Sequence, residues 1–369
     1  MPSIRRTGIV AAVLATPALA YRFAVVYRQR AGLPRRRLGE LTPADRGLPY
    51  ETTVVRSSAG DLPAWFIPAR DGASGPGVVL VHGWESNRDR TLPNAEVLHA
   101  AGFHVLTFDV RGHGDNPPET LPISVAEFRD DATAALETLL ARPEVTAGGF
   151  LGHSLGAVGA ILAAADAGER CAALVSTSAP ADPRRLTRQT FRLARLPIPE
   201  PFATPLAELT TRVYLRPRGH AMRDLSASRA VARYGGPLLL VHGALDSVVP
   251  PVHLARLEHA ALRGAAARRA AGEPAGGPVE TALIPDGQHS WLYELPAYRR
   301  TVAHFLADAL DGPYPPDDAA ERAAAVDTSR VPEPEESFAA VALRPGPRRT
   351  LAELIGSAEP VPVGLQEDE

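Results

Sequence analysis

A serine in the middle of the chain carries the strongest sign of chemistry. Ser154 is flanked by Gly152 and Gly156 in the sequence Gly-His-Ser-Leu-Gly, directly after an apolar run at 148–151 and before a helical stretch at 155–167. A serine at a sharp strand–turn–helix junction needs glycine neighbours, because the turn leaves no space for larger side chains. Such a turn places the hydroxyl at the carboxyl end of the sheet. The pattern therefore predicts a nucleophilic serine.

Two further residues supply what a serine nucleophile needs. A serine hydroxyl attacks poorly without a base, and the base is oriented in turn by an acid. Asp246 follows an apolar strand at 238–241, and His289 follows the last predicted strand. Because parallel sheets build their sites at the carboxyl ends of their strands, we expect a Ser154–Asp246–His289 triad. Asp182, which follows the preceding strand, is the alternative acid.

A loop after an earlier strand supplies hydrogen-bond donors for acyl transfer. The sequence His82-Gly83-Trp84 follows an apolar strand, which directs the Trp84 backbone N–H toward the site, beside that of Leu155. Two such donors stabilise the negative charge that develops on a carbonyl oxygen. Gly83 allows close approach of the backbone. We expect His82, Gly83 and His153 to bind the substrate next to this oxyanion hole.

Several histidines lie near this rim, but their spacing is not that of a metal site. The sequence has no H-E-x-x-H motif and no other paired-ligand spacing, and its single cysteine, Cys171, excludes Cys-rich metal sites and an intramolecular disulfide. The loop Arg111–Gly114 has too few glycines, wrongly spaced, for a phosphate or dinucleotide site. We predict neither a metal nor another cofactor.

The elements that must position these residues alternate between strands and helices. Leu62–Ile67 has the pattern of an antiparallel edge strand, and short apolar runs elsewhere are typical of parallel strands buried on both faces. These runs lie at 77–81, 103–108, 148–151, 172–176, 238–241 and 279–284, with helical stretches at 91–101, 124–140, 155–167, 251–263 and 296–310. The alternation predicts an α/β fold, with helices on both faces of a mostly parallel sheet. Two insertions interrupt it: a lid-like helical segment at 180–235 and a surface loop at 264–278.

Charge divides the chain of 369 residues into three parts. Overall, 39 basic and 42 acidic side chains give a net charge of −3, which argues against a nucleic-acid-binding protein. Residues 1–40 carry eight Arg and one Glu, net +7, and residues 311–369 carry thirteen acids and five Arg, net −8. We expect the domain to occupy 41–310. The acidic, Pro-rich tail is predicted to be mostly disordered.

The basic N-terminal segment has the features of a membrane signal. Residues 7–27 are largely apolar, and as a helix they would be about 31 Å long, enough to span a bilayer. More Arg residues follow this stretch than precede it, which favours a cytoplasmic domain at the membrane. Two alternatives stay open. One is a signal peptide cleaved after Ala18-Leu19-Ala20, which would make the protein secreted, and the other is an Ala-rich helix packed on the domain.

Five motifs, in this order, resemble those of the α/β-hydrolase fold superfamily, in its lipase/esterase and serine-aminopeptidase-like branch. They are HGW at 82–84, DVRGHG at 109–114, GHSLG at 152–156, GALDSVVP at 243–250 and GQHS at 287–290. The resemblance covers about residues 50–310. It implies the Ser154–Asp246–His289 triad and an oxyanion hole made by the Trp84 and Leu155 amides. The N-terminal segment is similar to the anchor of membrane-tethered members.

The predicted activity is hydrolysis of a carboxylic ester, either a small molecule or a lipid-derived substrate, through an acyl-enzyme on Ser154. His289 would remove the serine proton, and Asp246 would orient the imidazole. A thioesterase or a peptidase would use the same triad, and the sequence does not separate these activities. The alternative from another class is a non-catalytic binding protein of the same fold, with the Arg-rich segment 180–235 or the acidic tail as its binding surface.

Overall fold

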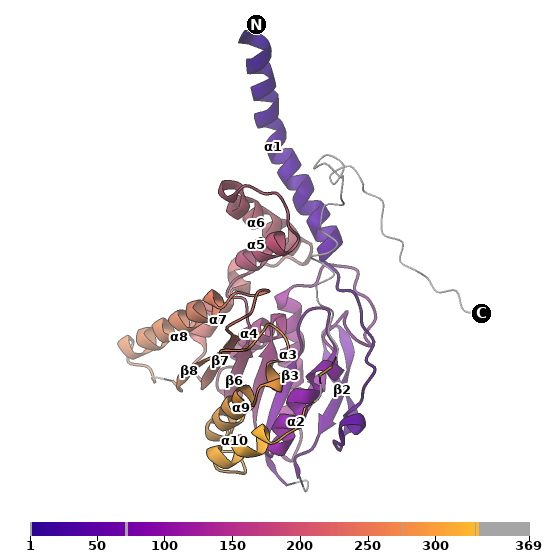
Figure 1. The fold of residues 1–369 in the computed structure, drawn as a ribbon, viewed down its shortest axis with the longest axis vertical. Coiled ribbons are helices and arrows are strands. Elements are labelled where there is room, and N and C mark those ends of the chain that lie inside the picture. The colour runs from indigo at the N-terminus through magenta and orange to yellow at the C-terminus, as the bar shows by residue number, and fades with distance from the viewer. Residues whose placement is uncertain (1, 71–72, 275, 329, 332–369) are drawn as a thin grey trace, which may run out of the picture.

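A central sheet of eight strands organises the chain (Figure 1). This computed structural model describes residues 2–70, 73–274, 276–328 and 330–331, with side chains from residue 16 onward. The strands are β1 (Glu51–Ser57), β2 (Gly60–Ile67), β3 (Gly75–Val81), β4 (His104–Phe108), β5 (Val145–His153), β6 (Ala173–Thr177), β7 (Leu238–Gly243) and β8 (Val279–Ile284). Their order in the sheet is β1-β2-β4-β3-β5-β6-β7-β8. β1 and β2 run antiparallel to their neighbours, and the pairs from β4 to β8 are parallel.

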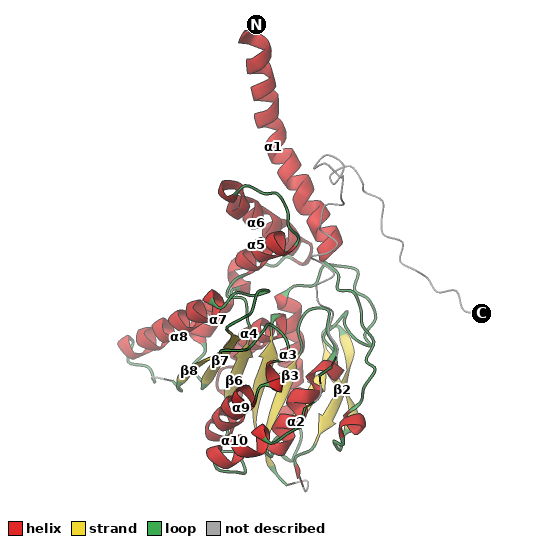
Figure 2. Cartoon of the chain, viewed as in Figure 1, coloured by secondary structure: helices red, strands yellow, loops and turns green. Residues whose placement is uncertain are grey.

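Helices cover both faces of this sheet (Figure 2). Those on one face are α3 (Val125–Leu140), α4 (Leu155–Ala167), α7 (Ala227–Arg233) and α8 (Val252–Ala270). Those on the other face are α2 (Leu92–Ala100), α9 (Pro296–Ala309) and α10 (Pro316–Ala324). Each layer has its own cluster of buried apolar side chains. The predicted fold class, a mostly parallel α/β sheet with helices on both faces, is confirmed.

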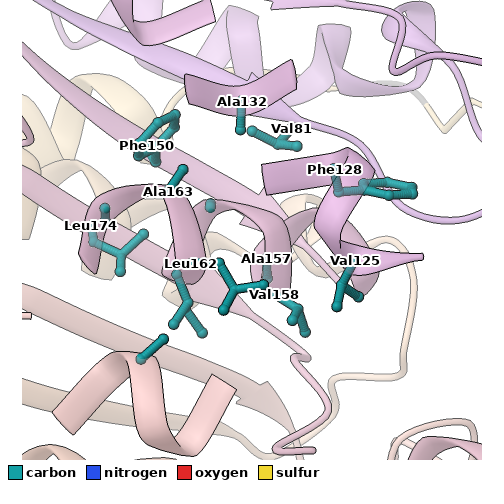
Figure 3. Packing of buried hydrophobic residues seen from close by; sticks show 14 of the residues in the cluster. Val81, Val125, Phe128, Ala132, Phe150, Ala157, Val158, Leu162, Ala163 and Leu174 are labelled. Atoms are coloured by element: carbon teal, nitrogen blue, oxygen red, sulfur yellow. The ribbon is translucent and has the colours of Figure 1, made fainter. Parts of the chain in front are cut away.

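Small residues let α4 lie close to the sheet and to α3. Ala157 and Ala163 of α4 pack in the same cluster as Phe128 of α3 and Phe150 of β5 (Figure 3). A Cβ atom added at Gly159 would lie 2.6 Å from the Cβ of Phe128, so only glycine fits this contact. The close packing fixes α4, which begins directly after the predicted nucleophile.

Two boundaries differ from those that the sequence predicts. β1 pairs outside β2, so the strand at 62–67 is not the edge of the sheet. Val55 is the one buried residue of β1, and this polar strand lacks the apolar run that marks the others. α8 continues to Ala270, into the predicted surface loop at 264–278. Gly264 lies against the Ala232 carbonyl, where a Cβ would approach to 2.0 Å, so this turn of α8 packs on the end of α7.

The C-terminal region contains a helix that the sequence analysis does not predict. α10 buries Ala319 and Ala323 in the cluster that α9 shares with the sheet, and the Arg322 guanidinium lies 3.9 Å from the ring centroid of Tyr314. The apolar face of α10 is made of three alanines, Ala319, Ala320 and Ala323, set among charged residues. Residues 332–369 of the predicted disordered tail lie outside the described residues.

Two segments lie beyond the carboxyl ends of the parallel strands (Figure 1). The first is the insertion between β6 and β7, with α5 (Pro183–Leu193), α6 (Glu200–Leu215) and α7. The second is α1 (Pro2–Ala31), whose last turns pack on α6 while its first half projects away from the domain. Among residues with described side chains, no helix combines the length and the apolarity needed to cross a bilayer. The predicted span at 7–27 begins before those residues, and it stays a prediction.

Candidate active site

Ser154 stands at a strained turn between β5 and α4. Its backbone has φ 53° and ψ −119°, a conformation that side-chain-bearing residues rarely adopt. The turn closes because its flanking glycines are tightly enclosed: a Cβ at Gly156 would lie 2.2 Å from the His82 carbonyl oxygen, and one at Gly152 would lie 2.6 Å from the Cα of Ala157. The Ser154 N–H donates to the Thr177 carbonyl at 2.9 Å. These contacts hold the hydroxyl in one place.

The structure brings Ser154, His289 and Asp246 into one hydrogen-bonded chain. The Ser154 hydroxyl donates to Nε2 of His289 at 3.1 Å, and Nδ1–H of His289 donates to Oδ2 of Asp246 at 2.7 Å. His289 lies in the loop after β8, and Asp246 lies in the loop after β7. Ser154 and Asp246 are buried, at 7% and 4% exposure. This arrangement is able to take a proton from the serine and to stabilise the resulting imidazolium.

Asp246 is held as a carboxylate by donors on both of its oxygens. The backbone N–H groups of Val248 and Val249 donate to Oδ1 at 2.9 and 2.8 Å, and Nε2 of His242 lies 3.3 Å from Oδ2. Burial acts to raise the pKa of Asp246, but the hydrogen bonds from His242 and His289 outweigh it, so this pKa lies well below its usual value. The carboxyl group of Asp246 therefore stays ionised while it orients His289.

Asp182, the alternative acid of the sequence analysis, has another role. It is the N-cap of α5, where its Oδ1 accepts the Arg185 N–H at 2.9 Å, and its carboxylate pairs with the Arg185 guanidinium at 2.8 Å. These partners tie it to its own helix. The hydrogen bond from His289 goes to Asp246.

The loop after β3 lies directly against the serine. A Cβ added at Gly83 would stand 3.4 Å from the Ser154 Cβ, and Gly83, Trp84 and Leu155 all line the same cavity as Ser154. The Trp84 ring meets the His113 ring edge-on, with centroids 5.4 Å apart. The backbone of this loop thus lies next to Ser154, and the oxyanion hole of the Trp84 and Leu155 amides stays a prediction.

Of the three predicted substrate-binding residues, the structure places Gly83 and His153 on the cavity but not His82. His82 is 2% exposed; its Nδ1–H donates to the Gly83 carbonyl at 2.8 Å, and its Nε2 accepts the Val110 N–H at 3.0 Å. Burial lowers the pKa of His82 to about 3. With both nitrogens used by the backbone, this ring fixes the loop and does not line the cavity.

The DVRGHG loop braces this edge of the sheet through buried charges. Asp109 accepts the Arg88 N–H at 2.7 Å and the Asp115 N–H at 3.0 Å, and it pairs with the Arg88 side chain. Burial raises the pKa of Asp109 to about 6. Arg111 pairs with Asp131 of α3, with side-chain exposures of 8% and 0%. These pairs fasten the loop to the core.

A cavity of about 560 Å³ opens at the serine, within the size range of small-ligand sites. Ser154, His289 and Gly83 line it at the sheet edge. Its opposite side, which we call the helical wall, is formed by residues of α1, α5 and α6: Tyr27, Ala31, Pro183, Leu186, Thr187, Thr190, Leu193, Thr211, Tyr214 and Leu215. Among the described residues, every side chain that these three helices give to the cavity is uncharged. Hydroxyl groups of this wall are hydrogen-bonded within the protein, as Thr187 is to Thr211 at 2.8 Å and Tyr214 to the Ile123 carbonyl at 2.6 Å, so this side of the cavity suits an apolar group.

Comparison with known proteins agrees with this geometry. A family model described as serine aminopeptidase, S33, matches residues 75–218, which include Ser154. Rv2307c, an uncharacterized protein of Mycobacterium tuberculosis, is 30% identical over 241 residues, which cover 64% of this chain and 74% of Rv2307c. The chain belongs to the α/β-hydrolase superfamily.

Solved structures share the α/β-hydrolase fold with this chain. The Pyrococcus furiosus esterase Pf2001 is 21% identical with a TM-score of 0.58, and the match covers 75% of this chain and 98% of that structure. Acylaminoacyl peptidase of Pyrococcus horikoshii is 17% identical with a TM-score of 0.52, over 74% of this chain and 44% of that structure. At these identities the likeness concerns the fold.

Sequence reasoning missed two contributions to the site of this α/β-hydrolase. His242 is buried, and its Nε2 lies 2.7 Å from the Val249 carbonyl and 3.3 Å from Oδ2 of Asp246. Its position four residues before Asp246 was the available signal. Tyr27 and Ala31 have no signal of this kind, because they precede the predicted domain. In the described part of the chain no cluster of three or more His, Cys, Asp or Glu is arranged to hold a metal ion.

Proposed function

We propose that this chain is a serine hydrolase that cleaves carboxylic esters with an apolar acyl group through an acyl-enzyme intermediate. The observation that carries the proposal is the hydrogen-bonded chain from Ser154 through His289 to Asp246, at 3.1 and 2.7 Å. Ser154 and His289 line a cavity whose helical wall is uncharged, and this supports an apolar acyl group in the substrate.

In the proposed first step, Ser154 Oγ forms a bond to the ester carbonyl carbon while its proton passes to Nε2 of His289. The carbonyl oxygen becomes an oxyanion, which the Trp84 and Leu155 N–H groups stabilise. When the C–O bond to the alcohol breaks, His289 returns the proton to the departing oxygen. The acyl group stays bound to Ser154, and Asp246 stabilises the imidazolium throughout.

In the second step, water enters the position that the alcohol has left. His289 takes a proton from the water as its oxygen bonds to the acyl carbon, and it returns this proton to Ser154 Oγ as the carboxylic acid departs. All proton transfers thus use one imidazole nitrogen, Nε2, which is the nitrogen that faces Ser154. The other nitrogen stays bound to Asp246.

A fluorophosphonate probe tests the proposal, because it reacts covalently with activated serines. We expect the wild-type protein and Ser74→Ala, an exposed control serine, to be labelled and to hydrolyse p-nitrophenyl esters. Ser154→Ala should lose labelling and lose turnover by about 10⁴-fold or more, while its melting temperature is retained. If the wild-type protein is neither labelled nor active on esters, thioesters and amides, the non-catalytic binding protein is the better description.

We also propose that the predicted segment 7–27 anchors the protein in a membrane through the part that precedes Phe23, with the hydrolase domain on the cytoplasmic side, because Phe23 and Tyr27 pack on α5. The apolar character of this part and the Arg residues that follow the segment support the proposal. The exposure of Leu19 and Tyr21, at 46% and 48%, leaves this part of α1 without a cover from the domain. The full chain should remain in the membrane pellet after carbonate washing, and the double variant Val10→Lys/Val13→Lys should be released. Release of the wild-type chain would contradict an anchor.

A further inference from the structure

The last turns of α1 reach the cavity that contains Ser154. Tyr27 and Ala31 line this cavity together with Ser154 and His289, although they precede the sheet in the sequence. Both are buried, at 7% and 5% exposure. The end of the N-terminal helix is therefore part of the cavity wall at the site.

Aromatic contacts fix this part of α1 to the insertion. The Tyr27 ring meets Phe191 of α5 with centroids 5.7 Å apart and planes at 82°, and it meets Tyr214 of α6 at 6.2 Å. Phe23, one turn earlier, meets the same Phe191 ring at 5.5 Å. The Tyr27 hydroxyl is hydrogen-bonded to Thr187 and Thr190. Edge-on ring contacts hold the rings in a defined orientation.

Hydrogen bonds then fix the end of the helix. The Tyr214 hydroxyl donates to the carbonyl of Ile123 at 2.6 Å and also lies 3.3 Å from that of Ala31. The Ile123 N–H donates to the Gly32 carbonyl at 2.9 Å. Because α1, α6 and the segment before α3 meet at these atoms, Ala31 cannot move away from the cavity without breaking contacts in all three.

The helical wall suits the part of a substrate that stays bound during the reaction. The leaving alcohol must depart before water attacks, whereas the acyl group remains on Ser154. Among the described residues, α1, α5 and α6 present uncharged side chains here, and the nearby acid, Asp182, is paired with Arg185. A hydrocarbon chain enters such a place favourably, because its apolar surface leaves water and it has no polar group to desolvate.

We propose that Tyr27 and Ala31 of α1 form the end of the acyl-binding region and set the length of the acyl chain that the enzyme accepts. This inference rests on the proposed function. It makes the N-terminal helix a determinant of specificity, and it predicts opposite results for two substitutions. Ala31→Leu adds volume at the end of the cavity and shortens the preferred chain, while Tyr27→Ala removes a ring and lengthens it.

The test measures kcat/KM for p-nitrophenyl esters from two to twelve acyl carbons. For Ala31→Leu the ratio of decanoate to acetate should fall about tenfold relative to wild type, the effect of added or missing carbons in an apolar pocket. For Tyr27→Ala the same ratio should rise. Gln29→Leu, an exposed position on the same helix, is the matched control and should keep the wild-type ratio.

The outcomes separate this inference from the proposed function. An unlabelled and inactive wild-type protein would overturn the proposed function, and the inference with it. A wild-type protein that hydrolyses esters, with unchanged decanoate-to-acetate ratios in both variants, would overturn the inference alone. An equal loss at every chain length would also overturn it, since it indicates a purely structural role. If Ala31→Leu unfolds at a lower temperature, Ala31→Val makes the same test with a smaller addition.

Discussion

The carboxyl edge of the sheet and the helical wall opposite it are built in different ways. At the sheet edge, backbone contacts decide the geometry: Ser154 has a positive φ, and Gly156 lies against the carbonyl of His82 with no space for a side chain. In the helical wall, side chains decide it, through the rings of Tyr27, Phe191 and Tyr214. The reaction chemistry is thus fixed by short local motifs, and the space for the substrate is fixed by packing between distant segments.

The two regions also differ in their charges. At the sheet edge, Arg111 and Asp131 form a pair with side-chain exposures of 8% and 0%. In the insertion, Arg188 and Glu200 pair with exposures of 31% and 66%. Buried pairs become costly when one member is removed, whereas exposed pairs contribute little. We therefore expect that removing one member of an ion pair lowers the stability of the fold strongly at the sheet edge. In the insertion, away from the helical wall, the same change should lower it only slightly.

The largest expected effect separates the two acids that lie near the cavity. Asp246→Asn should lower kcat by about 10⁴-fold, because an amide cannot hold the imidazole in the required tautomer. Asp182→Asn should have a small effect, because asparagine also caps helices well. Steady-state kinetics on a short ester measures both. The opposite ranking would assign the acid to Asp182 and would remove Asp246 from the site.

The sequence predicts the sheet edge well, because each of its parts has a local signature. Gly152 and Gly156 mark the turn at Ser154, and Asp246 and His289 each follow an apolar strand, so the structure brings together residues that the sequence already singles out. These residues need only a parallel sheet to meet, and the strand pattern predicts one.

The helical wall could not be predicted in the same way. The contact of Tyr27 with Phe191 joins segments that the sequence separates by the whole of β1 to β6, and aromatic residues in a helix carry no mark of their partner. Two phenylalanines of the insertion show this: Phe191 packs on α1 and Phe202 is 64% exposed, and neither lines the cavity. The sequence also does not reveal that the backbone uses both nitrogens of His82, whose side chain does not line the cavity.

The second prediction compares the two ion pairs. Arg111→Met leaves Asp131 buried without its partner and should lower the free energy of unfolding by about 3 to 5 kcal/mol. Arg188→Met, on the exposed surface of the insertion, should lower it by about 1 kcal/mol or less. Urea unfolding followed by circular dichroism measures both. Equal losses of unfolding free energy would mean that the ion pair of the insertion contributes as much to stability as the buried pair. The contrast between the two regions would then be wrong.

The smallest expected effect is a loss of stability at acidic pH, caused by a buried histidine at the sheet edge. Burial lowers the pKa of His113, beneath the Trp84 loop, to about 4, whereas an unfolded histidine has a pKa of about 6.5. Between these values the unfolded chain binds a proton that the folded chain does not, so the free energy of unfolding falls as the pH falls from about 6.5 to about 4. At pH 5.5 this one residue lowers the free energy of unfolding by about 1 kcal/mol.

His113→Phe should remove that contribution and keep the ring among Trp84, His82 and Phe128. The difference in the free energy of unfolding between pH 7.5 and pH 5.5 should shrink by about 1 kcal/mol relative to wild type. His259→Gln, at an exposed position of α8, should leave the difference unchanged. If His113→Phe keeps the wild-type pH dependence, burial of His113 does not make the sheet edge acid-sensitive.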